Sequence, residues 1–215
     1  MQVDISGEVF ELLHRKAMFW PRTRILLLAD LHLGKINHFR RSGIPLPAKA
    51  NDRNIELLLD LIQEVKPERV VFLGDLFHSH YNQEWEVFGE LVRHFRSISF
   101  ELVLGNHDIM SELQYERKGI RLHRELVIDR FILTHHPMDE VSPGYYNLAG
   151  HIHPGVCMYG RGKQALTLPC FYFGNHQALL PAFGVFTGLA KIRPTKDDKI
   201  FVILEDRIVD VNHVA

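Results

Sequence analysis

An apolar run passes directly into two potential metal ligands in the stretch Ile25-Leu26-Leu27-Leu28-Ala29-Asp30-Leu31-His32. Short, uninterrupted apolar runs of this kind predict buried strands. Four further runs have the same form: Val70-Val71-Phe72-Leu73, Leu102-Val103-Leu104, Phe131-Ile132-Leu133 and Asn147-Leu148-Ala149. They end at Gly74-Asp75, Gly105-Asn106-His107-Asp108, Thr134-His135 and Gly150-His151-Ile152-His153. Five strands are therefore expected to bring carboxylate, imidazole and amide groups to one edge of a sheet.

Two segments between these runs have the periodicity of amphipathic helices. From about residue 48 to residue 66, apolar side chains recur at spacings of three and four, and Pro67 ends the pattern. A second helix is predicted over about residues 83–96. The β-α-β-α-β order predicts a parallel central sheet with right-handed crossovers. Open sheets of this type bind ligands at the carboxyl ends of their strands.

The rest of the chain predicts strands and one long loop. One or two strands are expected within residues 2–13, and residues 34–47, with two glycines and two prolines, predict the loop. Later strands are expected at 126–134, 147–150, 165–170, 199–204 and 207–212, the last two joined by a turn at Glu205-Asp206. The apolar stretches 166–173 and 178–189 are interpreted as core and sheet edge. We expect a single α/β domain over residues 1–215, with a two-layered β core flanked by helices.

The composition is that of an ordinary globular chain and indicates no particular partner. Apolar residues make up 46% and charged residues 24% of the chain, which is enough for one sizeable core. The formal charge of −1 gives no overall basic field of the kind that attracts nucleic acid. No apolar stretch approaches the roughly 20 residues that span a bilayer. The N-terminus has no signal-peptide pattern, so we expect a cytoplasmic protein without membrane contact.

The polar clusters have the chemistry of a two-metal site. Asp30 and His32 are two residues apart, so in an extended chain both project to the same side, and His151 and His153 repeat this spacing. Carboxylate, imidazole and amide oxygen suit divalent Mn, Fe or Zn. We expect seven ligands, which are too many for one tetrahedral ion and fit two ions that share a carboxylate. They are Asp30, His32, Asp75, Asn106, His135, His151 and His153.

Taken in order, the five clusters resemble the motifs of the calcineurin-like metallophosphoesterases over residues 25–153. The resemblance implies a metallophosphoesterase-type β-sandwich of two mixed sheets flanked by helices, with the active site at the carboxyl ends of strands. It also implies two metal ions. By motif position, the first ion would bind Asp30, His32 and His153, the second would bind Asn106, His135 and His151, and Asp75 would bridge them.

Two residues of the third cluster are candidates for catalysis. Two neighbouring ions activate water and stabilise the attacking and leaving oxygens of a phosphate ester. His107 is the candidate to neutralise the phosphoryl oxygens and protonate the leaving alkoxide. Asp108 would orient His107 by accepting its second ring N–H, or would only cap the turn. His136 is either a neighbour of the ligands or merely exposed.

The gaps between the clusters leave no room for a lid domain. His135 follows Asn106 by 29 positions, and His151 follows His135 by 16 positions. We therefore expect an open site without a cap, which favours polymeric or exposed phosphodiesters as substrates.

Four further residues are candidates for substrate contacts. His38, Arg40 and Arg41 follow the first cluster and would contact DNA phosphate, unless this loop is simply solvated. His78 follows Asp75 by three residues and would reach the phosphate or support a ligand.

A narrower resemblance, over nearly the whole chain, is to the ligase-associated DNA-damage-response phosphoesterases of bacteria. It rests on Leu31-His32-Leu33-Gly34-Lys35, on residues 39–47, on Gly74-Asp75-Leu76-Phe77-His78-Ser79, on His135-His136-Pro137, on Gly150-His151-Ile152-His153-Pro154, on Leu168-Pro169-Cys170-Phe171 and on residues 180–188. The resemblance implies a phosphodiesterase or nuclease that acts on DNA in repair. An ATP-dependent DNA ligase and a helicase would be its partners.

Three functions stay open at this stage. The first is a manganese-type phosphodiesterase or nuclease acting on DNA, favoured by the open site. The second is a small-molecule phosphoesterase that acts on a cyclic nucleotide or a nucleotide, favoured by the near-neutral charge, since DNA affinity depends heavily on cationic contacts. The third is a non-catalytic scaffold, which is disfavoured because every motif residue is present.

Overall fold

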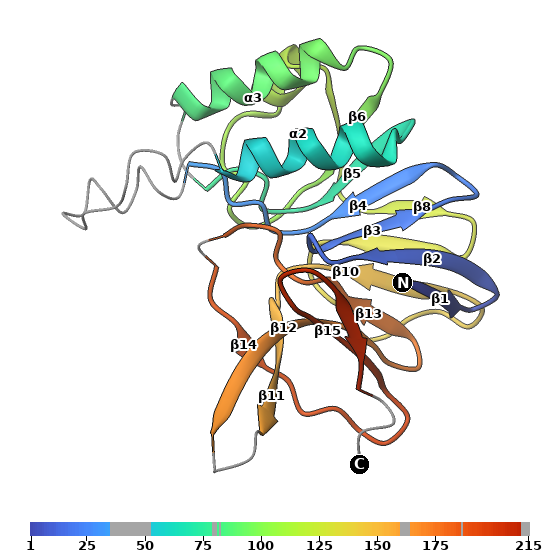
Figure 1. Ribbon diagram of the computed structural model, residues 1–215. Coiled ribbons are helices and arrows are strands. Elements are labelled where there is room, and N and C mark those ends of the chain that lie inside the picture. Colours follow the sequence, from blue (N-terminus) through green and yellow to red (C-terminus); the bar gives the residue numbers. More distant parts are fainter. Residues whose placement is uncertain (35–52, 79–80, 82, 160–163, 186, 212–215) are drawn as a thin grey trace.

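Two stacked β-sheets form the body of the protein in a computed structural model that describes residues 1–34, 53–78, 81, 83–159, 164–185 and 187–211 (Figure 1). The first sheet has seven strands in sequence order. They are β1 (Gln2–Ile5), β2 (Glu8–Leu13), β3 (Ala17–Trp20), β4 (Ile25–Leu28), β5 (Arg69–Leu73), β6 (Ser99–Val103) and β7 (Ile120–His123). Strands β1 to β4 pair antiparallel, and β4 to β7 pair parallel. The sheet is therefore mixed, with the predicted parallel part on one side.

The second sheet is also mixed and contains nine strands. They are β8 (Leu126–Ile128), β9 (Phe131–Thr134), β10 (Tyr146–Ala149), β11 (Pro154–Tyr159), β12 (Ala165–Phe173), β13 (Gln177–Leu179), β14 (Ala190–Lys191), β15 (Lys199–Ile203) and β16 (Ile208–Asp210). Strands β9, β10 and β13 pair parallel, whereas β8, β12 and β16 pair antiparallel with their neighbours. Figure 1 shows β11 and β12 extending away from the helices.

Helices cover the outer face of the first sheet. They are α2 (Arg53–Val65), α3 (Gln83–His94) and α4 (Glu112–Arg117). Leu58 of α2, Phe88 of α3 and Tyr115 of α4 share one buried cluster with alternate residues of the sheet, such as Leu26 and Phe72. None of the helices in the described ranges is long and apolar enough to span a membrane.

A second core fills the space between the two sheets. On β4, Leu26 and Leu28 face the helices, whereas Ile25 and Leu27 belong to the cluster that joins the sheets. This explains the unbroken apolar run, because a strand buried on both faces has no polar side to alternate with. The rings of Phe10, Trp20 and Phe131 anchor the inter-sheet core, with centroids 5.0–5.1 Å apart.

Most of the elements expected from the sequence are confirmed, and several were missed. The β-sandwich of two mixed sheets and both long helices are confirmed. The single strand expected over 126–134 is wrong, because a turn at Asp129, with φ of 53°, divides it into the hairpin β8–β9. Strands β3, β7, β11, β13 and β14 and helix α4 were not predicted. The loop expected over 34–47 and the start of the first expected helix lie almost wholly outside the described residues.

The single-domain organisation stays a prediction. In favour of it, residues 107–134, where a lid would have to be inserted, instead form α4, β7, β8 and β9. Strands β7 and β8 extend the two existing sheets at their edges.

A buried ion-pair network ties the parallel strands together. Glu101 of β6 is 3% exposed, and its carboxylate accepts a hydrogen bond from Arg69 Nε of β5 (2.7 Å). His123 Nε2 of β7 lies 2.9 Å from the other carboxylate oxygen. Burial alone would raise the pKa of Glu101, but the contacts with Arg69 and His123 hold it below its usual value. The charged form of Glu101 therefore stabilises the folded state.

Replacing this carboxylate should destabilise the protein in a pH-dependent way. At pH 7, Glu101→Gln should lower the free energy of unfolding by about 1–3 kcal/mol, because the cation of Arg69 loses its charged partner. The pKa of Glu101 is lower in the folded state than the unfolded value of about 4.5, so its charge stabilises the folded state above that pH. This stabilisation is lost as the pH falls further. Urea titrations from pH 7 to pH 3 should show the gap to wild type closing. The matched control is Glu90→Gln, in an exposed pair with Arg93, which should change stability by less than about 1 kcal/mol. A gap that stays constant with pH would contradict the account.

Candidate metal centre

The exits of β4 and β5 are held side by side by backbone hydrogen bonds. The Asp30 N–H donates to the Gly74 carbonyl (3.2 Å), and the His32 N–H donates to the Asp75 carbonyl (2.9 Å). Asp30, His32 and Asp75 have left-handed backbones with φ of 54°, 48° and 50°. The extended geometry expected at Asp30 and His32 is therefore wrong, because both residues lie past the end of β4. The paired left-handed turns nevertheless direct both side chains into one cluster.

Asp30, His32 and His153 bring three potential ligand atoms together. His153 Nε2 lies 3.3 Å from Asp30 Oδ1 and 3.4 Å from His32 Nε2. Asp30 Oδ1 is buried, and no donor among the described residues bonds to it. The other ring nitrogen of His153 donates to the Gly188 carbonyl (3.2 Å), which leaves Nε2 as the atom that can bind a metal ion.

A second group of ligand atoms surrounds His135 Nε2. This atom lies 3.0 Å from Asn106 Oδ1, 3.2 Å from His151 Nδ1 and 3.4 Å from Asp75 Oδ1. His135 Nδ1 donates to the Leu73 carbonyl (2.9 Å), so the lone pair of the ring is on Nε2.

Asp75 lies between the two groups. Its Oδ1 faces His135 Nε2, and its Oδ2 lies 3.8 Å from His32 Nε2. The side chain is 2% exposed, and Oδ1 accepts a hydrogen bond from the backbone N–H of His107 (2.9 Å). One carboxylate therefore contributes to both groups.

Both groups have the spacing and the chemistry that divalent ions require. Two ligand atoms that each lie about 2.1 Å from one ion are about 3.0–3.4 Å apart in octahedral or tetrahedral geometry. Mixed nitrogen and oxygen donors suit ions of the Mn, Fe and Zn type. A buried carboxylate oxygen without a hydrogen bond, Asp30 Oδ1, is accounted for by a cation. Burial, together with His136 and His135, lowers the pKa of His151 and favours its neutral, metal-binding form.

The second group is the more open side of the site. Asp75 and His135 are each 2% exposed, whereas Asn106 and His136 are exposed. The ring of His136 lies against those of His151 and His135, with centroid distances of 4.1 Å and 4.7 Å. Of the two alternatives for His136, a neighbour of the ligands or a merely exposed residue, the structure thus agrees with the first.

His107 and His78 lie beside the first group. Their ring centroids are 4.1 Å apart, and the His107 ring is 5.6 Å from that of His32. His78 Nδ1 lies 3.2 Å from His32 Nδ1. His78 therefore contacts a ligand directly, in keeping with the supporting position considered for it. His38, Arg40 and Arg41, the other expected substrate contacts, lie outside the described residues.

Asp108 has a different environment from the one expected in the catalytic interpretation. Its Oδ2 accepts hydrogen bonds from the backbone N–H groups of Asp75 and Gly105 (both 2.9 Å). Its Oδ1 accepts from the Phe77 N–H (3.2 Å). No bond from the His107 ring to this carboxylate is among the described contacts. Asp108 thus holds the second and third clusters together. This role resembles turn capping, the second of the two roles considered for it. Burial raises its pKa to about 6 despite these bonds.

Comparison with known proteins identifies the family. The family model described as calcineurin-like phosphoesterase matches residues 23–207. The chain belongs to this family. It is accordingly a metal-dependent hydrolase of phosphoester bonds. No curated protein sequence matches it.

Two solved phosphoesterase-like structures resemble this member of the family to different degrees. The chain is similar to Pseudomonas putida nuclease MPE, with 27% identity, 98% of each chain covered and a TM-score of 0.80. It is also similar to Yfce, a phosphoesterase from E. coli, with 13% identity, 86% of this chain and 90% of that chain covered, and a TM-score of 0.43.

A strap formed by residues 182–185, 187 and 188 supports the backbone of the first ligand group, which the sequence did not reveal. The Phe183 N–H donates to the Ala29 carbonyl (2.8 Å), and the Gly184 N–H donates to the Asp30 carbonyl (3.1 Å). The Gly188 carbonyl orients His153. Sequence analysis interpreted this segment as core and sheet edge, because its apolar residues gave no sign of the backbone contacts.

Two buried polar residues of the helices were also missed. Asn54 of α2 donates from Nδ2 to the Leu31 carbonyl (3.2 Å) and accepts at Oδ1 from the Val185 N–H (3.1 Å). Glu84 of α3 accepts a hydrogen bond from the Gly34 N–H. Both are ordinary polar residues in amphipathic helices, and the only available signal was their place on the apolar face, where a polar side chain needs a partner.

A methyl group added to the strap should loosen the first ligand group. The Cβ of Gly184→Ala would lie 2.7 Å from the Leu31 carbonyl oxygen and 3.1 Å from that of Asp30, so the loop that holds Asp30 and His32 must move. Mn²⁺ affinity should fall about 10- to 100-fold, as it does when supporting residues of a metal ligand are disturbed. Isothermal titration calorimetry on apo-protein measures this directly.

The matched control is Gly188→Ala in the same strap. Nothing lies within 4 Å of its added Cβ, and the backbone carbonyl that orients His153 remains, so affinity should be unchanged. Equal affinities for both variants and wild type would contradict a supporting role for the strap.

Proposed function

We propose that the chain is a dinuclear phosphodiesterase that cleaves DNA. The observation that carries the proposal is the pair of ligand groups joined by Asp75 and open to solvent at Asn106. The likeness to a nuclease at 27% identity over 98% of both chains supports a nucleic acid as the substrate class, and the resemblance to the ligase-associated DNA-damage-response phosphoesterases favours DNA.

The first ion would be held by Asp30, His32 and His153 and the second by Asn106, His135 and His151, with Asp75 shared. When bound, the two ions would activate a water molecule and neutralise charge on the phosphate. The left-handed turns and the carbonyls of Leu73 and Gly188 keep the ligand atoms in place before the ions arrive. Such preorganisation removes the need to reorder ligands during catalysis.

His107 would protonate the leaving oxygen. Its backbone N–H donates to Asp75, the expected bridging ligand, and its ring packs at a tilt against that of His78 beside His32. The ring is therefore held next to the ions but is not one of the expected ligands. Asp108 would act as a positioning residue, because it fixes the backbones of Asp75 and Gly105.

Three finer statements belong to the same proposal. Manganese is the expected metal, with Fe or Zn as alternatives, since the mixed donor set suits all three. The expected location is the cytoplasm. An ATP-dependent DNA ligase and a helicase are the expected partners, and DNA repair the expected process, by the resemblance to the ligase-associated phosphoesterases.

A small-molecule phosphoesterase is the second candidate, favoured by the formal charge of −1. An activity panel with added Mn²⁺ separates the two. It contains a phosphate monoester, a phosphate diester, a 2′,3′-cyclic nucleotide, and single- and double-stranded DNA. Cleavage of DNA that falls steeply with salt is expected. Activity on the cyclic nucleotide alone would rule out the DNA proposal.

Removal of the His107 ring should slow the chemical step without changing metal binding. For substrates with a poor alkoxide leaving group, His107→Ala should lower kcat by about 10²- to 10⁴-fold, because the leaving oxygen loses its proton donor. A p-nitrophenolate leaving group needs no proton, so its loss should be much smaller. Metal content, measured by inductively coupled plasma mass spectrometry, should equal that of wild type.

The control is His94→Ala at the end of α3, where His94 lines a groove whose lining includes no expected site residue. It should leave both activities unchanged. If His107→Ala instead loses metal but keeps normal turnover per occupied site, the proton-donor role is wrong.

A further inference from the structure

A second concave site lies beside the metal-ligand loops. It is a cleft of about 820 Å³ between α2, the β2–β3 turn and the second sheet. Its polar rim consists of His14, Arg15, Lys16, Arg53, Asp60 and Glu205. Its apolar wall includes Leu57, Leu168, Phe183 and Val185. None of the lining residues is an expected metal ligand or a proposed catalytic residue. Leu168, Phe183 and Val185 belong to stretches that carry the narrower resemblance, but no role in catalysis or substrate binding has been given to them.

Two cations of the rim are available to an anion. Lys16 sits in the β2–β3 turn with φ of 61°, is half-buried, and forms no ion pair within the described part of the chain. Burial without an acidic partner lowers the pKa of Lys16, because the charged ammonium group has no counterion there. A bound anion would supply this counterion and so stabilise the charged form. Arg53, the first residue of α2, is exposed. Arg15 is less available, because it pairs with Glu64 (3.3 Å).

The wall of the cleft offers a surface for a flat apolar group. Val185 is 44% exposed, and Leu166, which also lines the cleft, is 60% exposed. A single strand of nucleic acid presents phosphates, which cations bind, alternating with flat bases, which can pack on apolar side chains. A free inorganic anion would use the cations and leave the apolar wall unused.

The cleft is connected to the metal centre through shared elements. Asn54, the neighbour of Arg53, bonds both the Val185 N–H and the Leu31 carbonyl between two expected ligands. Gly184, the neighbour of Val185, bonds the Asp30 carbonyl. The wall of the cleft and the back of the first ligand group are therefore the same pieces of chain.

We propose that this cleft binds a stretch of single-stranded nucleic acid adjacent to the phosphodiester bond being cleaved, with Lys16 and Arg53 contacting its phosphates. The proposal rests on the proposed function and adds to it a substrate-binding surface outside the catalytic centre. It also accounts for how a chain without a basic overall charge holds a polyanion, because only a few cations have to be correctly placed.

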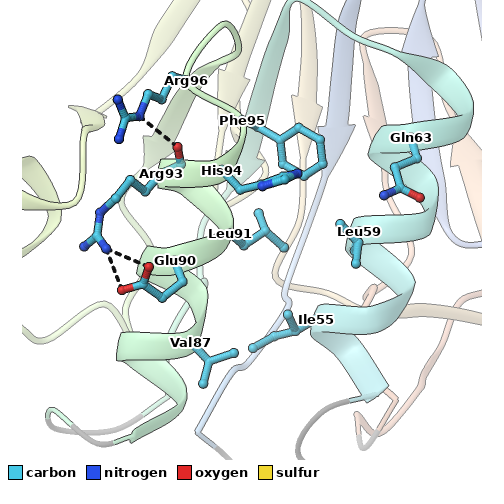
Figure 2. Close-up of a pocket in the computed structure, with 10 residues that line it drawn as sticks. All are labelled: Ile55, Leu59, Gln63, Val87, Glu90, Leu91, Arg93, His94, Phe95 and Arg96. Atoms are coloured by element: carbon cyan, nitrogen blue, oxygen red, sulfur yellow. Dashed lines mark hydrogen bonds and ion pairs between the residues drawn. The ribbon is translucent and has the colours of Figure 1, made fainter.

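A second groove gives the internal control. It lies between α2 and α3 and is lined by residues that include Leu59, Leu91, Phe95 and Arg96 (Figure 2). Figure 2 shows Arg93 bound to Glu90, and Arg96 bound to the Arg93 carbonyl. Arg96 thus offers a positive charge of the same kind in a groove that shares no residue with the ligand loops.

The test compares Lys16→Gln and Arg53→Gln with Arg96→Gln. Binding of a fluorescent single-stranded oligonucleotide of about 20 nucleotides is measured by anisotropy in EDTA, over a range of salt concentrations. Each cleft variant should reduce the slope of log K against log salt by about 0.7, the value for one lost phosphate contact on a single strand. In Mn²⁺, KM for the oligonucleotide should rise several-fold with kcat unchanged, and kinetics on a small chromogenic diester should equal those of wild type.

A variant with the opposite expected effect excludes damage to the fold as the cause of weaker binding. Glu205→Gln removes an exposed negative charge from the rim and should tighten oligonucleotide binding, which damage to the fold would not do. Arg96→Gln should match wild type. If the cleft variants match Arg96→Gln in slope and KM while wild type cleaves DNA, the cleft proposal is wrong and the proposed function stands. If wild type neither binds nor cleaves DNA, the proposed function itself fails.

Discussion

Left-handed backbone at the strand exits is the constraint on which the metal centre depends. Of the non-glycine residues with positive φ in the described ranges, half are expected ligands. They are Asp30, His32, Asp75, His151 and His153. Such conformations cost about 1–3 kcal/mol each and persist only where the surroundings enforce them. Here the β4 and β5 exits bond each other, and Asp30 Oδ2 accepts the His151 N–H (2.9 Å), so each turn is held by another turn of the site.

The expected ligands come from both sheets, so the centre requires the sandwich to be assembled. Asp30, Asp75 and Asn106 follow strands of the first sheet, whereas His135 and His153 follow strands of the second. The inter-sheet core of Phe10, Trp20 and Phe131 fixes the distance between these two sets. Close backbone approach is part of the same arrangement, since a Cβ at Gly74 would lie within 3 Å of the His135 ring.

The sequence predicted the elements that neighbouring residues determine, and it missed the features that depend on contacts between distant parts of the chain. Strand β4 was recognised because its apolar run leads directly into Asp30 and His32, whereas β3, at Ala17–Trp20, has the same length and burial but no such motif after it. The liganding residue types were visible in the motifs, but their left-handed geometry was not, because hydrogen bonds between separate loops impose it. Asp108 shows the same limit: its donors, Asp75, Gly105 and Phe77, are brought together only by the fold. The role of the strap depends on backbone groups that no side-chain pattern encodes.

The central claim is that one buried carboxylate, Asp75, joins two metal-binding groups into a dinuclear centre. Electron paramagnetic resonance of the Mn²⁺-loaded protein, together with the metal content per chain, tests it most directly. Wild type should hold two ions per chain with a spin-coupled spectrum, and Asp75→Asn should lose the coupling, since an amide is a poor bridge. A wild-type spectrum of isolated Mn²⁺ at one ion per chain would contradict the account.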